Sequence, residues 1–103
     1  MAVVVLASAN QDFWINHLDL RVVSSRHPLP SPSPEPSALR LLGAIINALD
    51  TLPIIFISEI DGRAIGGGNE LAVHTDLRYL GPSALFGIPE VAGGLVHGGV
   101  CIA

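Results

Sequence analysis

The chain has 103 residues, of which half are hydrophobic and only 14% are charged. This balance suits a single buried α/β core and argues against a disordered chain. Nine acidic residues stand against five arginines, with no lysine, which gives a net charge of −4. Because binding to a phosphate backbone needs clustered lysine or arginine, the composition argues against a nucleic-acid-binding protein.

Cysteine usage and the length of the apolar runs bear on compartment and membrane state. The single cysteine, Cys101, rules out an intramolecular disulfide and a cysteine metal cluster, and it fits an intracellular protein. The apolar runs at residues 2–7 and 52–57 are far shorter than the ~20 residues that cross a bilayer, so we expect no membrane span. No basic segment precedes the first run, which argues against a signal peptide. Since the chain enters a strand at once, we expect the upstream part of its domain to be missing.

The N-terminal half contains two strand signals and a long loop. Residues 3–6 are apolar and mostly β-branched with no polar alternation, which predicts a strand buried on both faces in a parallel sheet. Residues 13–15 form a second, shorter apolar run. Over 27–36 five prolines alternate with other residues, two of them serines, and each proline removes an amide donor. This Pro/Ser-rich segment predicts an extended surface loop within the domain.

A helix and a second buried strand follow the loop. Ser37 is a candidate N-cap, and the amphipathic pattern predicts a helix over 37–49 that Pro53 separates from the next element. Residues 52–57 predict a strand, with Ile60 continuing its apolar path. We expect this strand to lie beside the strand at 2–7, with the helix packed on the sheet.

Shorter elements fill the rest of the chain. Residues 62–68 predict a glycine-rich turn and 69–75 a short helix. Strands are expected at 77–80 and 84–86, on either side of a turn. Strands that alternate with helices predict an α/β fold.

The run from Gly66 to Glu70 follows a strand and opens a helix, so its exposed backbone amides could hold an anion. No Lys-Ser/Thr pair follows the glycines, and the glycines are not spread out, which excludes a phosphate loop and a dinucleotide fingerprint. Two interpretations are left: a donor for an oxyanion, or a simple strand-to-helix turn in which Glu70 complements the helix dipole.

A second carboxylate lies twenty residues further on, in the run from Phe86 to Val91. Gly87 permits an unusual turn and Pro89 fixes φ, so Glu90 is held in a rigid corner among apolar neighbours. Partial desolvation there suits a general acid. The alternative is an ordinary carboxylate at the start of a helix.

Taken together, these segments resemble the crotonase superfamily, the enoyl-CoA hydratase/isomerase family. The resemblance lies in the order and spacing of four segments, at residues 65–72, 76–79, 84–91 and 94–99. Upstream, residues 3–9 and 12–20 are similar to the strand that leads to the family's first oxyanion loop. The resemblance spans nearly the whole chain, apart from the loop at 27–36.

The resemblance implies a fold and an assembly. The expected fold is α/β: a partial, incomplete ClpP/crotonase-like spiral core with parallel strands and flanking helices. Residues 1–103 would form one partial enoyl-CoA hydratase/isomerase domain, truncated at both ends. The full-length protein would be a homotrimer or a hexamer.

The resemblance also implies site residues. The thioester carbonyl of an acyl-CoA would accept hydrogen bonds from the backbone amides of Leu18 and Gly67, which form the oxyanion hole. Glu70 and Glu90 match the two acid/base carboxylates: one activates water, and the other delivers the α-proton. No metal or separate cofactor is implied, since coenzyme A is part of the substrate.

The chain departs from the family pattern before the first oxyanion amide. Asn16 and His17 stand where small residues are usual, Trp14 is bulkier than the usual residue, and His97 replaces a common proline. His17 is therefore either a catalytic group or a loop-packing residue.

The leading hypothesis is an acyl-CoA-binding lyase that hydrates 2-enoyl-CoA in fatty acid metabolism. The alternatives are an enoyl-CoA isomerase, another crotonase-type lyase, and a non-catalytic fragment or pseudoenzyme, so enzyme activity stays open. The sequence indicates an intracellular location but does not distinguish mitochondrion, peroxisome and cytosol.

Overall fold

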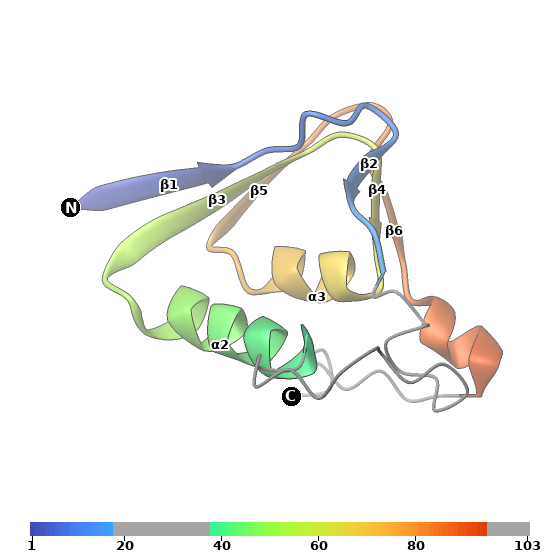
Figure 1. Ribbon diagram of the computed structural model, residues 1–103. Coiled ribbons are helices and arrows are strands. Elements are labelled where there is room, and N and C mark those ends of the chain that lie inside the picture. Colours follow the sequence, from blue (N-terminus) through green and yellow to red (C-terminus); the bar gives the residue numbers. More distant parts are fainter. Residues whose placement is uncertain (18–37, 95–103) are drawn as a thin grey trace.

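The computed structural model describes residues 1–17 and 38–94 (Figure 1). The predicted loop at 27–36, the N-cap at Ser37, His97 and Cys101 lie outside these residues. Within them, none of the helices is long and apolar enough to span a membrane.

The described strands form two parallel sheets. In the first, β3 (Ile54–Ile60) lies between β1 (Ala2–Leu6) and β5 (Leu77–Leu80). β1 and β3 pair in register from Ala2↔Ile54 to Leu6↔Ser58, so the predicted neighbourhood of the two apolar strands is confirmed. Parallel neighbours need crossover connections, and helices supply them here.

The second sheet has the order β2-β4-β6, formed by β2 (Phe13–Ile15), β4 (Arg63–Ile65) and β6 (Leu85–Gly87). Each strand of the first sheet is followed in the chain by one strand of the second, and the second sheet turns steeply away from the first (Figure 1). Neighbouring bends are joined by hydrogen bonds, from the Arg63 amide to the Asp12 carbonyl at 3.0 Å and from the Leu85 amide to the Gly62 carbonyl at 3.0 Å.

The predicted glycine-rich turn over 62–68 is wrong in its extent. Only Asp61 and Gly62 make the bend, and β4 and the start of a helix occupy the rest. Gly62 has a φ of 86°, and a Cβ there would lie 2.7 Å from the Asp12 carbonyl carbon. The bend therefore requires glycine, because the backbone at Gly62 lies directly against the backbone at Asp12.

Three helical segments connect or follow the strands: α2 (Ala38–Thr51), α3 (Gly67–Val73) and the 3₁₀ helix η1 (Pro89–Gly93). α2 runs two residues beyond its predicted end, where the Thr51 hydroxyl donates to the Asn47 carbonyl at 2.7 Å. α3 begins at Gly67, two residues before the predicted start.

The helix was predicted to pack on the sheet, whereas α2 lies beside α3 (Figure 1). A hydrogen bond between Asp50 and His74 joins the two helices.

The core lies in the angle between the two sheets and α3. Its buried members are Trp14, Ile60, Ala64 and Ala72. The Trp14 indole also donates to the Leu6 carbonyl at 3.3 Å, and this hydrogen bond links β2 to the end of β1. The bulky Trp14 side chain thus fills part of the core.

The prediction that the first strand is buried on both faces is wrong for the described chain. β1 is an edge strand, and Val3 and Val5 are 53% and 55% exposed. The register places them on the same face as Leu77 and Tyr79 of β5, which are also exposed. An apolar run indicates that a strand can be buried, but the position of the strand in the sheet decides whether it is buried.

We expect the isolated chain to self-associate through this apolar face, because exposed apolar patches drive association. Val3→Thr combined with Val5→Thr keeps strand propensity and should lower the associated fraction in sedimentation velocity. The control is Val4→Thr, which changes the opposite, half-buried face and should leave association unchanged. A monodisperse monomer with cooperative thermal unfolding would contradict the expectation.

Candidate active site

The predicted site residues follow the ends of the second sheet's strands. β2, β4 and β6 are parallel neighbours and end at Ile15, Ile65 and Gly87. The segments after these ends, which carry His17, Gly66 and Glu90, therefore leave the sheet at the same edge. Residues far apart in the sequence are brought together in this way.

Gly66 joins β4 to α3. Its amide donates to the Gly87 carbonyl at 2.9 Å, which extends the pairing of β4 with β6. Its carbonyl accepts the Glu70 amide at 3.0 Å, which forms the first turn of α3. With φ 55° and ψ −117°, this residue has a backbone conformation that favours glycine.

Two further segments press against Gly66. A Cβ at this position would lie 2.8 Å from Glu90 Oε1 and 3.0 Å from His17 Cβ. The missing side chain therefore makes room for the carboxylate of η1 and for the chain that leaves β2.

Gly67 and Gly68 form the start of α3. The Gly67 amide is one of the first helical amides, which have no acceptor within the helix. A Cβ on Gly68 would overlap the Ile15 carbonyl oxygen and lie 2.8 Å from the Ile15 carbonyl carbon. The end of β2 thus lies directly on the first turn of α3.

Glu70 lies in this first turn and is 8% exposed. It is the one buried acidic side chain among residues 1–17 and 41–94. Burial of a carboxylate is costly unless partners satisfy it, so its position is specific rather than incidental.

Glu90 is the second residue of η1 and is half-buried. Its Oε1 faces Gly66, while its Oε2 is buried and accepts no hydrogen bond in the part of the chain that the structure describes. A buried carboxylate oxygen without a donor is unusual and calls for an explanation such as a catalytic role.

The structure thus brings Glu90 and His17 to Gly66, next to Gly67, and puts Glu70 one turn along α3. Leu18, the other predicted oxyanion donor, lies outside the described residues. His17 lies against Gly66 through its Cβ, which leaves both interpretations of this residue as predictions.

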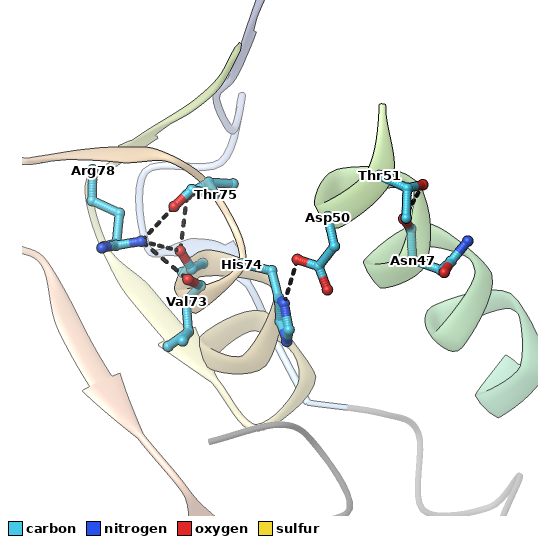
Figure 2. A network of polar contacts seen from close by, with 8 residues as sticks. Asn47, Asp50, Thr51, Val73, His74, Thr75 and Arg78 are labelled. Atoms are coloured by element: carbon cyan, nitrogen blue, oxygen red, sulfur yellow. Dashed lines mark hydrogen bonds and ion pairs between the residues drawn. The ribbon is translucent and has the colours of Figure 1, made fainter. Parts of the chain in front are cut away.

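Sequence reasoning missed the groups that hold the C-terminal end of α3. Arg78 Nη1 donates to the carbonyls of Ala72, Val73 and Thr75, at 3.0, 3.2 and 2.6 Å (Figure 2). A cation on the last carbonyls of a helix satisfies acceptors that the helix leaves open. Asp76 then exchanges two hydrogen bonds with the Phe56 backbone, at 2.8 and 2.9 Å, which joins the end of α3 to β3.

A surface hollow and the distribution of possible metal ligands are the two other features that bear on a site. A shallow hollow at the bends between the sheets contains none of the predicted site residues; it is lined by Ala7, Ser8, Asn10, Gln11, Glu59 and Asp61. Among the described residues, no three His, Cys, Asp or Glu side chains gather as a metal site would require.

Known proteins resemble this chain in both sequence and fold. The model of the enoyl-CoA hydratase/isomerase family matches residues 1–102. The protein named Probable enoyl-CoA hydratase 2, mitochondrial, from Arabidopsis thaliana is 37% identical over 68 residues, which are 66% of this chain and 23% of that protein. The fatty acid oxidation complex subunit alpha of Shewanella halifaxensis is 32% identical over 98 residues, which are 92% of this chain and 13% of that protein.

A solved structure also resembles this chain in fold. It is described as an enoyl-CoA hydratase from Thermobifida fusca YX in complex with acetoacetyl-CoA, and it superposes with a TM-score of 0.68 at 26% identity. The match covers 97% of this chain and 42% of that one. The chain therefore spans less than half the length of each of these three proteins.

We expect Gly68→Ala to destabilise the fold by about 1–3 kcal/mol, the usual cost of overpacking, because the new methyl group would force β2 away from α3. Gly43→Ala is the matched control. Gly43 lies within α2 with nothing within 4 Å of its would-be Cβ. That change should stabilise the chain by roughly 0.5–1 kcal/mol. Urea unfolding measures both, and equal midpoints for Gly68→Ala and the unchanged chain would refute the close contact.

Proposed function

The chain belongs to the enoyl-CoA hydratase/isomerase family, and we propose that it carries the site of a hydratase that adds water to a 2-enoyl-CoA. One observation carries the proposal. The Glu90 carboxylate faces Gly66, directly before the amide of Gly67, and keeps a buried oxygen without a hydrogen-bond donor among the described residues. A carboxyl group beside a backbone donor is what hydration of a thioester-activated double bond needs.

In the proposed mechanism the thioester carbonyl accepts hydrogen bonds from the amides of Leu18 and Gly67. Addition of water at the β-carbon drives electrons onto this carbonyl oxygen, which becomes an enolate oxyanion. Fixed donors stabilise that charge without reorganising, and removal of one such donor typically costs about 3 kcal/mol. The sharp turn at Gly66 is suited to this task because it holds the Gly67 amide at the start of α3.

Glu70 and Glu90 are proposed as the acid/base pair. One carboxylate takes a proton from water as the water oxygen bonds to the β-carbon. The other, in its acid form, gives a proton to the α-carbon and so collapses the enolate to the 3-hydroxyacyl product. Burial of Glu70 and half-burial of Glu90 support these roles, because both side chains are held away from bulk water.

The proposed ligand is an acyl-CoA thioester, with no metal and no separate cofactor, because the thioester itself supplies the activating group. The acetoacetyl-CoA in the description of the Thermobifida fusca structure supports this ligand class. We also propose a role in fatty acid metabolism, an intracellular location and, for a full-length protein, a homotrimer or hexamer. The mitochondrial name of the Arabidopsis relative is consistent with the location.

We expect Glu70→Gln and Glu90→Gln each to lower hydration of a four-carbon 2-enoyl-CoA by at least ~100-fold, since general acid–base groups contribute about 10²–10⁴-fold. Dissociation constants for the acyl-CoA should change little, because the amides that bind the thioester stay in place. Loss of the conjugated thioester's ultraviolet absorbance measures hydration, and calorimetry measures binding.

The matched control is Glu59→Gln, which changes an exposed carboxylate of β3 and should leave both quantities unchanged. Near-normal turnover in both site variants would refute the hydratase and favour an isomerase or another lyase. An unchanged chain that folds and binds acyl-CoA without turnover would favour the non-catalytic interpretation.

A further inference from the structure

A histidine and an aspartate join the two helices next to the candidate site. His74 caps the C-terminal end of α3, with a side chain that is only 7% exposed. Its Nδ1 lies 2.9 Å from Oδ1 of Asp50, which stands in the last turn of α2 and is 49% exposed (Figure 2). The hydrogen bond thus connects residues that are 24 positions apart.

The same helices also approach each other at their other ends. Cδ2 of Leu42 would lie 3.7 Å from a Cβ on Gly67. Leu42 and Asp50 are about 12 Å apart along α2, and Gly67 and His74 are about 10.5 Å apart along α3, at 1.5 Å per residue. Because these spans nearly agree, α2 and α3 lie side by side and run in the same direction, as Figure 1 shows.

The His74 ring has a polar atom that costs stability. Its Nε2 is buried and has no hydrogen-bond partner among the described residues. An apolar side chain of similar size would avoid this cost, so packing alone does not account for a histidine here. What the imidazole adds is a directed bond to one atom on α2.

The remaining anchors of α3 hold its C-terminal end to the first sheet rather than to α2. They are the Arg78 guanidinium and the two hydrogen bonds that the Asp76 carboxylate and amide make with the Phe56 backbone. Loss of the Asp50–His74 bond would leave these in place but would remove the hydrogen bond that joins α2 to α3. The approach of Leu42 to Gly67 would then rest on packing alone.

We propose that Asp50 and His74 are positioning residues, which hold α2 against α3 and thereby keep Gly67 and Glu70 in place. They are not catalytic residues, since Asp50 lies at the end of α2 and His74 at the end of α3, away from Gly67. The catalytic half of this proposal rests on the proposed function, whereas the structural half concerns only the first turn of α3.

Hydrogen exchange tests the structural half without any turnover. The probes are the amides of residues 70–72, of which the Glu70 amide donates to the Gly66 carbonyl. Asp50→Ala and His74→Leu should each raise their exchange rates at least three-fold, and the double variant should exchange no faster than the faster single variant. Asp50→Asn should exchange like the unchanged chain, because an amide still pairs with the imidazole nitrogen.

Thr51→Ala is the matched control. It removes a hydrogen bond that stays within α2, one residue after Asp50 (Figure 2). Exchange at residues 70–72 should not change. Equal exchange in Asp50→Ala and Thr51→Ala would overturn the proposal, and so would an Asp50→Asn variant as fast as Asp50→Ala. Because Asp50 is half-exposed, these variants keep the test informative even if His74→Leu fails to fold.

Turnover tests the catalytic half. Asp50→Ala should lower kcat for hydration about ten-fold with KM within two-fold, and Asp50→Asn should restore it. A merely structural role would instead lower the folded fraction and leave kcat per folded molecule unchanged, which would overturn this half. If the unchanged chain hydrates no enoyl-CoA, the proposed function fails by itself, and the exchange rates still decide the positioning of α3.

Discussion

The close contact between Gly68 and the Ile15 carbonyl is the constraint on which the site depends. It lets the end of β2 lie on the first turn of α3 with no side chain between them. The chain that leaves β2 is thereby directed toward Gly66, where the Glu90 carboxylate also arrives. A larger residue at position 68 would separate these segments. The glycine at position 68 therefore serves packing, and the proposed oxyanion donor would follow from the same turn.

The two sheets explain why distant residues meet there. Each pass of the chain runs through the first sheet, bends, and continues into the second, and backbone hydrogen bonds hold the bends together. The parallel strands of the second sheet then end at one edge. His17, Gly66 and Glu90 are separated by 49 and 24 positions in the sequence, yet each follows such an end. Topology, rather than local structure, assembles the site.

How much the sequence predicted depends on the range of the interaction. The apolar runs gave β1 and β3, and the amphipathic pattern gave α2, because local burial leaves a local pattern. β4 was missed because three residues between glycines carry too short a signal. The exposure of Val3 was missed because a run does not encode sheet order. Glu70 and Glu90 were singled out by their neighbours, and only the family resemblance joined them into one site.

Two arginines whose side chains the structure describes, Arg63 and Arg78, bear on the proposed role of Glu90. A guanidinium beside a carboxylate favours its charged form and would withdraw it from proton transfer. Arg63 instead lies over the Phe13 ring, 5.5 Å from its centroid, and Arg78 is engaged by the carbonyls at the end of α3. Both cations thus serve the scaffold. Glu90 meets Gly66 through one oxygen and keeps the other buried without a donor in the described part of the chain. The proposed hydration asks Glu90 to exchange a proton with the substrate, and neither of these two guanidinium groups is placed to hold it in an ion pair instead.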